Sequence, residues 1–369
     1  ELHAWINPFR ARYFKTLSNA SADHVVQRNP DWIVPYGNLM WMDPGIPEVR
    51  EHVLKVALDI VARYDVDGLH VDDYFYPYPL RGPGVGWLNF PDGVSYSRYR
   101  SGGGRLDVFD WRRSNVDQFV EALYAGVHRT KPWVKVGISP FGIWRPGFPP
   151  GIRGLDQYQV LYSDARRWLN EGWCDYFAPQ LYWTLDRPEQ SFNGLLRWWE
   201  QENRRGRLMT PGLNSAKIGE DRQVGDTLGQ ITIARKIGAE GEIFWNATSL
   251  MRNYGGLANR LPGGLFAQTA LVPPTPWLKA PLPEAPEMRN ASTGTNLVSL
   301  SWTLATNAPT RNLVLHQRVG RQWRSEILSP RVTQRIFDRR RGQMIPEEVR
   351  LIPISRIGAE GAAAVWTAK

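Results

Sequence analysis

Two adjacent aspartates, Asp72 and Asp73, offer the most distinctive chemistry in the sequence. They end a short apolar run and are followed by tyrosines at alternate positions, Tyr74, Tyr76 and Tyr78. Buried carboxylates destabilise a fold unless they are paired, so this arrangement is costly if its purpose is only structural. Cleavage of a glycosidic bond uses a carboxylic acid as proton donor and a second group that stabilises an oxocarbenium-like centre. The run 67–77 therefore predicts a site for sugar chemistry.

The two aspartates are expected to have different roles. Neighbouring residues of a regular strand point in opposite directions, so the pair does not match two facing carboxylates ~5–5.5 Å apart. Asp73 lies where the strand opens into a loop, and it is expected to be the general acid, with Asp72 as its electrostatic partner. A nearby like charge raises the pKa of one carboxyl group, which suits an acid that must stay protonated. Two alternatives remain open: Asp72 caps the loop or pairs with an arginine, and Asp186 is the second carboxylate.

Six strand-like segments alternate with helical or helix-length segments over the first 250 residues. Such alternation predicts a parallel sheet with right-handed crossovers, as in an α/β barrel. The strands are expected at residues 2–7, 66–72, 134–139, 174–183, 208–213 and 242–246. The helices are expected at residues 47–64, 114–130, 155–171, 192–204 and 226–237.

Polar and aromatic residues gather at the C-terminal ends of these strands, where barrel enzymes place their chemistry. We expect these residues to bind substrate. They are His3, Trp5, Asn7, Arg10, His70, Tyr74, Tyr76, Trp144, Gln180, Tyr182, Trp183, Asp186, Asn214 and Trp245. Seventeen tryptophans are unusually many, and those near strand ends suit stacking against sugar rings.

No metal or cofactor is expected from the motifs. His3 and His70 lie on adjacent predicted strands, but no His-x-His, His-Glu-x-x-His or cysteine cluster accompanies them. A histidine hydrogen-bonded to a carboxylate in the barrel floor is the preferred interpretation. A metal-dependent polysaccharide deacetylase, with His3, His70 and Asp72 as ligands, is the alternative. The glycines at 102–104 are not followed by Lys-Ser/Thr, so a phosphate-binding loop is not expected.

Charge divides the chain unevenly. The net charge is +9, and the residues from 273 onward hold 14 Lys/Arg against 7 Asp/Glu, or +7. No nucleic-acid recognition motif accompanies this charge, so a solvated face, or weak attraction to an anionic envelope or polysaccharide, is the preferred interpretation. No apolar run approaches the ~20 residues of a membrane span. Cys174, the single cysteine, lies in an apolar segment and is expected to be buried.

The C-terminal part has a different pattern. Residues 273–286 are rich in proline and predict a linker, which separates a domain of residues 1–272 from residues 287–369. Short strand-like runs without a helical pattern follow the linker and indicate a small β-sandwich. The Leu300-Ser301-Trp302 run and the later strand 349–354 resemble a fibronectin type III module.

Three separated motifs carry a resemblance to a known family. They are residues 3–8 (HAWINP), 67–77 (DGLHVDDYFYP) and 168–183 (WLNEGWCDYFAPQLYW). Together they resemble the bacterial glycosyl-hydrolase-like 10 family over roughly residues 1–270. The resemblance implies a TIM (β/α)8-type barrel, export to the periplasm, cell envelope or outside, and hydrolysis of bacterial glycan strands. Implied substrates are peptidoglycan glycan stripped of its peptides, or partly deacetylated poly-N-acetylglucosamine. Against this family, the first two βα units are expected to be missing before Leu2.

The spacing Asp-Gly-Leu-x-x-Asp is also similar to the fourth strand of family-18 chitinases, in which the acetamido group of the substrate is the nucleophile. The chitinase acid position falls on Tyr74 here. In a substrate-assisted reaction Gln180 and Tyr182 would hold the acetamido group. The first hypothesis is thus a hydrolase of an envelope glycan, with a polysaccharide and the cell wall as partners. A non-catalytic carbohydrate-binding protein and the deacetylase are the alternatives.

Overall fold

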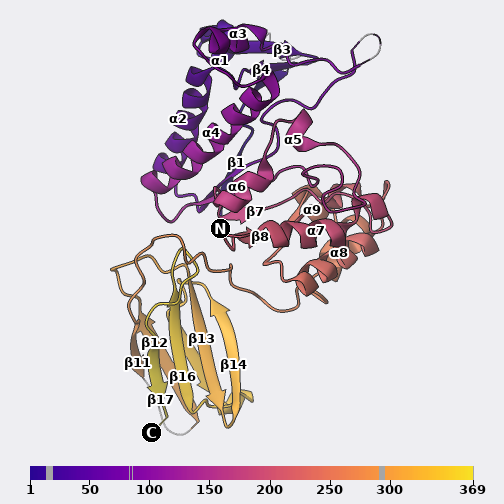
Figure 1. The fold of residues 1–369 in the computed structure, drawn as a ribbon. Helices are drawn as coiled ribbons and strands as arrows, with labels where there is room; N and C mark the ends of the chain where they lie inside the picture. Colours follow the sequence, from indigo (N-terminus) through magenta and orange to yellow (C-terminus); the bar gives the residue numbers. More distant parts are fainter. Residues whose placement is uncertain (14–19, 83, 85, 291–295, 369) are drawn as a thin grey trace. The chain divides into compact units, whose positions relative to one another are not determined.

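The computed structural model describes residues 1–13, 20–82, 84, 86–290 and 296–368. The chain divides into two compact units, Glu1–Leu265 and Phe266–Lys369. Each unit has a hydrophobic core of its own. The two units are described separately below (Figure 1).

Unit 1 is built on parallel strands in sequential order, as the alternation of strands and helices predicts. Five strands form one sheet in the order β1-β5-β6-β7-β8. A second parallel pair, β9-β10, continues it through a bridge between Gln180 and Gly212. The strands are β1 (His3–Ile6), β5 (Gly68–Val71), β6 (Lys135–Ile138), β7 (Tyr176–Phe177), β8 (Leu208–Met209), β9 (Gly212–Leu213) and β10 (Ile243–Phe244). All six predicted strand regions are confirmed, and the fold is of the α/β barrel type.

Helices cover the outer side of these strands. Helices α2 and α4 lie side by side (Figure 1). Leu69 and Val71 of β5 are fully buried, and α2 turns four buried residues at helical spacing towards the core, from Val49 to Val61. The helices are α1 (Val25–Arg28), α2 (Pro47–Arg63), α3 (Gly93–Ser101), α4 (Val108–Thr130), α5 (Gln157–Val160), α6 (Ala165–Glu171), α7 (Phe192–Glu202), α8 (Val224–Ile237), α9 (Ala247–Met251) and α10 (Leu257–Arg260).

Three local features differ from the prediction. A small antiparallel sheet, β2-β4-β3, stands between β1 and α2; its strands are β2 (Arg10–Tyr13), β3 (Ile33–Tyr36) and β4 (Leu39–Met42). Helix α4 begins before the predicted residue 114, because the Asp107 side chain accepts a hydrogen bond from the Asp110 amide and caps the helix there. The predicted helix 155–171 is two helices, α5 and α6. Tyr162, between them, has a φ of 54°, which no α-helix accommodates.

Unit 2 is a β-sandwich. Its core includes Leu300, Trp302, Leu315 and Leu351. One sheet has the order β11-β12-β15 and the other β14-β13-β16-β17. The strands are β11 (Glu287–Asn290), β12 (Leu297–Thr303), β13 (Asn312–Val319), β14 (Gln322–Leu328), β15 (Gln334–Asp338), β16 (Glu348–Ile354) and β17 (Ala364–Thr367).

The proline-rich segment 273–286, predicted as a linker, packs onto the sandwich. The Thr275 amide donates to the Ile357 carbonyl at 2.9 Å, and Thr275 is fully buried. The Ala362 amide reaches the Pro283 carbonyl at 3.3 Å. These hydrogen bonds pair backbone N–H and C=O groups that would otherwise be buried without partners. The segment therefore belongs to unit 2, and the boundary between the units falls at residue 265.

Candidate active site

Strand β5 carries Asp72 and Asp73 at its C-terminal end. Their side chains are almost entirely buried, with 6% and 2% of each residue exposed. Asp72 leans towards β1, where the indole Nε1 of Trp5 donates to its Oδ2 at 3.1 Å. The Tyr74 amide donates to its Oδ1 at 3.2 Å, and the Asn7 amide nitrogen lies 3.5 Å from both oxygens. Asp72 therefore caps the start of the loop, as one sequence alternative expects, and also faces β1.

Asp73 is held from the opposite side. The Tyr78 hydroxyl donates a short hydrogen bond to its Oδ2, and the Gln180 side chain, at the end of β7, donates a further one. Gln180 is itself fixed, because its Nε2 donates to the Ser139 carbonyl at 2.9 Å. Two side-chain donors stabilise the ionised form of Asp73.

The surroundings of Asp72 and Asp73 oppose the ionisation of both carboxyl groups at the same time. Burial, and then the charge of Asp73, raise the pKa of Asp72 from 3.8 to about 7. Burial also raises the pKa of Asp73, and the bonds from Tyr78 and Gln180 oppose that rise. The environment therefore favours one proton on the pair near neutral pH, and the charge of Asp73 favours Asp72 as the group that binds it.

Aromatic rings surround the pair. The Arg10 guanidinium lies 5.4 Å from the centre of the Tyr74 ring, and no ion pair joins Arg10 to Asp72 among the described residues. The rings of Trp5 and Trp245 meet edge to face with their centres 5.9 Å apart, and both are about half exposed. Tyr182 lies close enough for the charge of Asp73 to add to the rise in its pKa that burial causes. Exposed rings beside buried carboxyl groups suit a sugar chain.

Two residues that were predicted to bind substrate lie away from the carboxyl pair. Tyr76 and Trp144 belong to the core, and their prediction as contacts of a sugar bound at Asp72 and Asp73 is corrected. Tyr76 is fully buried against Phe90 and Tyr162. Trp144 is 8% exposed and its ring stacks on Trp198. Their large apolar surfaces decide their place, although both follow strand ends in the sequence.

Three further residues that were predicted to bind substrate lie at the periphery of the site. Trp183 is half-buried against Phe141, a ring that also meets Tyr78. Asp186 is exposed and accepts from the Thr184 hydroxyl at 2.5 Å; none of the contacts described for it reaches the carboxyl pair. Asn214 is partly buried, and its Oδ1 has no hydrogen-bond partner among the described residues. A second carboxylate at Asp186 therefore gains no support.

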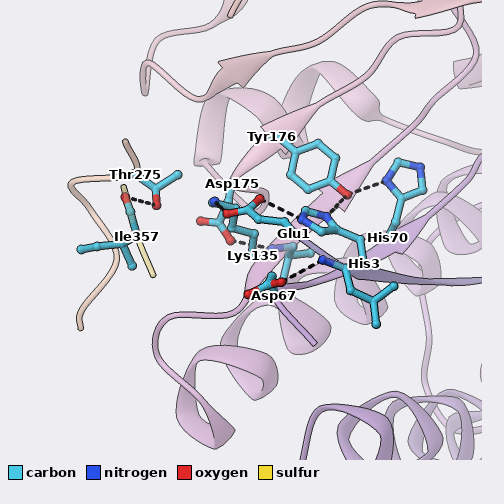
Figure 2. A network of polar contacts seen from close by, with 11 residues as sticks. Glu1, His3, Asp67, His70, Lys135, Asp175, Tyr176, Thr275 and Ile357 are labelled. Atoms are coloured by element: carbon cyan, nitrogen blue, oxygen red, sulfur yellow. Dashed lines mark hydrogen bonds and ion pairs between the residues drawn. The ribbon is translucent and has the colours of Figure 1, made fainter. Parts of the chain in front are cut away.

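Below the pair, a polar network forms the floor of the barrel (Figure 2). The Tyr176 hydroxyl bonds to Nδ1 of His3 at 2.8 Å and to Nδ1 of His70 at 2.9 Å. His3 Nε2 contacts Glu1 Oε2 at 3.1 Å, and the buried Lys135 ammonium pairs with the same carboxylate. Burial, and then His3, lower the pKa of His70 to about 4. The carboxylate partner expected from the sequence is present for His3, as Glu1, whereas His70 bonds to the Tyr176 hydroxyl instead.

Both histidines thus turn to a tyrosine hydroxyl, whereas the deacetylase alternative needs them to converge with Asp72. No group of three or more metal-binding side chains occurs in the part of the chain that the structure describes.

Two glycines leave space for the side chains of the polar network in the barrel floor. A Cβ on Gly68 would lie 2.4 Å from His3 Nδ1, and one on Gly137 would lie 1.9 Å from Cζ of Tyr176.

Sequence reasoning missed two residues of this arrangement. Tyr78 was expected only as part of a tyrosine ring around the aspartates, whereas it donates directly to Asp73. Tyr78 follows Tyr76 by two residues, a spacing that in a regular strand would place both side chains on the same side. The sequence therefore gave no sign that Tyr78 reaches Asp73 while Tyr76 enters the core. Tyr176 had a usable signal, because it precedes the inward Gln180 by an even number of residues on one predicted strand.

Among the described residues, no helix combines the length and the apolar character that crossing a bilayer requires.

Comparison with known proteins places these observations in a family context. The family model described as "Glycosyl hydrolase-like 10" matches residues 1–227. Glycosyl hydrolase YngK of Bacillus subtilis (strain 168) is 36% identical over 310 residues, which are 80% of this chain and 59% of that protein. Glycosyl hydrolase DigH of Escherichia coli (strain K12) is 36% identical over 240 residues, 61% of this chain and 52% of that protein. The chain thus spans little more than half the length of these relatives.

Among solved structures, the glycoside hydrolase domain of PgaB (BpsB) from Bordetella bronchiseptica is similar. It shares 12% identity and a TM-score of 0.46, over 70% of this chain and 73% of that one.

Proposed function

The chain belongs to the glycosyl hydrolase-like 10 family, and from this membership we propose that it is a glycoside hydrolase acting on an N-acetylhexosamine glycan of the bacterial envelope. Glycan strands of peptidoglycan and poly-N-acetylglucosamine are the two substrates proposed. Both relatives compared above bear the name glycosyl hydrolase. The observation that carries the proposal is the buried carboxyl pair, because one of its members keeps a proton near neutral pH.

In this proposal Asp72 donates its proton to the glycosidic oxygen as the bond to the leaving sugar breaks. Asp73 stays ionised and stabilises the positive charge that develops at the sugar ring. These roles are the reverse of those expected from the sequence, in which Asp73 is the general acid and Asp72 its electrostatic partner. Tyr78 and Gln180 favour the charged form of Asp73, whereas burial and Asp73 itself favour the protonated form of Asp72.

The first half of the reaction is proposed to use the substrate itself. As the bond to the leaving sugar breaks, the acetamido oxygen would attack the anomeric carbon and close a cyclic oxazolinium, while Asp73 accepts a hydrogen bond from the acetamido N–H. In the second half water would attack the anomeric carbon and reopen this ring, and the water proton would return to the Asp72 carboxylate. Tyr182 supports this arrangement, since its hydroxyl has no hydrogen-bond partner among the described residues and lies near both aspartates. Gln180, expected to hold the acetamido group, already donates to Ser139 and Asp73 and is proposed to position Asp73 instead.

A hydrolysis assay tests the proposal. Peptide-free glycan strands and poly-N-acetylglucosamine are incubated with the protein, and released ends are identified by mass spectrometry. Asp73→Asn keeps the shape of the side chain but loses the charge that stabilises the transition state, and we expect turnover to fall by about 10²–10³-fold. Asp186→Asn is the matched control, because Asp186 is an exposed carboxylate whose described contacts do not reach the pair.

Turnover by Asp73→Asn at the rate of the control would refute the assignment of the pair. Tight binding of either glycan without any cleavage by the unmodified protein would instead favour the non-catalytic carbohydrate-binding alternative. Export and association with the cell wall are proposed with the substrate, since an envelope glycan lies outside the cytoplasm.

A further inference from the structure

A small pocket lies on the other side of the loop that follows β5. Its volume is about 190 Å³. Tyr36, Tyr76, Phe90 and Tyr162 are buried and form its floor, and each is at most 8% exposed. Trp87, with 65% of its surface exposed, stands among the lining residues, and we call this cavity the Trp87 pocket.

The lining combines two kinds of chemistry. Besides its aromatic rings, the Trp87 pocket contains the exposed side-chain amides of Asn89 and Gln159. Neither amide has a hydrogen-bond partner within the described part of the chain. The Tyr76 hydroxyl, in the floor, is also without a partner among the described residues. A ligand with apolar C–H faces and hydroxyl or amide edges satisfies both kinds of lining, and a sugar ring is such a ligand.

The pocket has a fixed frame. The Tyr36 hydroxyl donates to the Leu88 carbonyl at 2.9 Å and accepts from the Leu80 amide at 3.0 Å. These bonds tie both arms of a turn in which Arg81 and Trp87 form an antiparallel bridge. At the floor, the Arg112 guanidinium donates to the Tyr162 hydroxyl at 2.6 Å. Preformed walls lower the ordering cost of binding.

The Trp87 pocket is connected to the carboxyl pair by a short piece of chain. Pro77 and Pro79 line the pocket, while Tyr78, between them, turns to Asp73. Alternate residues of an extended segment point to opposite sides, so one loop serves the pair on one side and the pocket on the other. The cavity is smaller than the ~300–1,000 Å³ of pockets for drug-sized ligands, so it accommodates one ring and not an oligomer.

We propose that the Trp87 pocket is a distal subsite, which binds one sugar residue of a glycan chain whose cleaved bond lies at Asp72 and Asp73. This inference rests on the proposed function. It adds that the enzyme senses chain length, because only a chain long enough to pass round the loop occupies both places.

The experiment compares chain lengths in the full chain. N-acetylglucosamine oligosaccharides from the disaccharide to the octasaccharide are the probes. We expect Trp87→Ala to lower kcat/KM on the octasaccharide about tenfold, mainly through KM, and to change it less than twofold on the shortest cleaved oligomer. Gln159→Ala should act in the same direction. Trp323→Ala is the matched control, since it removes an exposed tryptophan of the β-sandwich.

Binding supplies a readout that is independent of turnover. In an Asp73→Asn background, calorimetry should show a weaker Kd for the octasaccharide when Trp87 is also replaced. Equal loss on all chain lengths, or no loss on any, would overturn the subsite and leave the hydrolase standing. If the unmodified protein neither cleaves nor binds these probes or the two polymers above, the subsite and the proposed function fail together. Circular dichroism of each variant excludes loss of folding as the cause.

Discussion

The replacement Asp72→Asn is expected to remove activity and, at the same time, to stabilise the fold above neutral pH. Burial, and then Asp73, raise the pKa of Asp72 from 3.8 to about 7 in the folded protein. An acid with a raised folded pKa keeps its proton in the native state while the unfolded chain has lost it. Stability contributed by this group therefore falls as pH rises from about 4 to 7.

The size of the effect follows from the same shift. Moving the pKa from 3.8 to about 7 corresponds to ~4 kcal/mol of unfolding free energy at pH 8. Asparagine is neutral at every pH and keeps the oxygen that accepts from the Tyr74 amide. We expect Asp72→Asn to be more stable than the unmodified protein by a few kcal/mol at pH 8, and by much less at pH 5.

Urea unfolding at several pH values measures this difference. Tryptophan fluorescence reports mainly on unit 1, which holds 13 of the 17 tryptophans. Burial also raises the pKa of Asp43 and of Asp117 to about 6, so only the difference between variant and unmodified protein is informative. Asp186→Asn is the control and should leave the pH dependence unchanged. A constant difference from pH 5 to 8 would show that Asp72 is ionised in the folded protein and would refute the assignment of the proton.

Two further predictions concern groups that support the site. Tyr78→Phe removes a hydrogen-bond donor to Asp73 and so raises the pKa of that carboxyl group. The acidic limb of the pH profile of kcat/KM should therefore move to higher pH. An unchanged acidic limb would show that Tyr78 does not tune the ionisation of Asp73. Gly137→Ala should cost about 1–3 kcal/mol in urea unfolding, because the new Cβ would lie 1.9 Å from Cζ of Tyr176. Gly225→Ala, which meets nothing within 4 Å, is its control, and equal stability of the two variants would contradict the packing argument.

The order of strands could be predicted from the sequence because each strand leaves a local signal. Leu69 and Val71 alternate with His70, and the period of two fixes which side faces the helices. The sheet β2-β4-β3 gave a weaker signal, since Pro35 and Gly37 interrupt its runs and antiparallel pairing over a short turn leaves little periodicity.

The site itself could be predicted only in part. Position at a strand end correctly brought Trp5, Asp72 and Gln180 together, because parallel strands end at one edge. The same rule placed Trp144 in the site, although the structure buries its ring against Trp198. Which of two faces a loop residue takes depends on contacts distant in sequence, and periodicity holds no information about them.

The floor of the barrel has a consequence for the acid above it. Continuing the inward side of β5, His70 stands directly before Asp72 at a spacing of two. A protonated imidazole there would favour the ionised form of Asp72 and lower its pKa. Burial and His3 instead lower the pKa of His70 to about 4, so the ring is neutral at the pH where Asp72 must hold a proton. The ammonium of Lys135, the buried cation of the floor, is paired with Glu1. A neutral His70 beneath the pair is therefore part of what allows Asp72 to remain an acid.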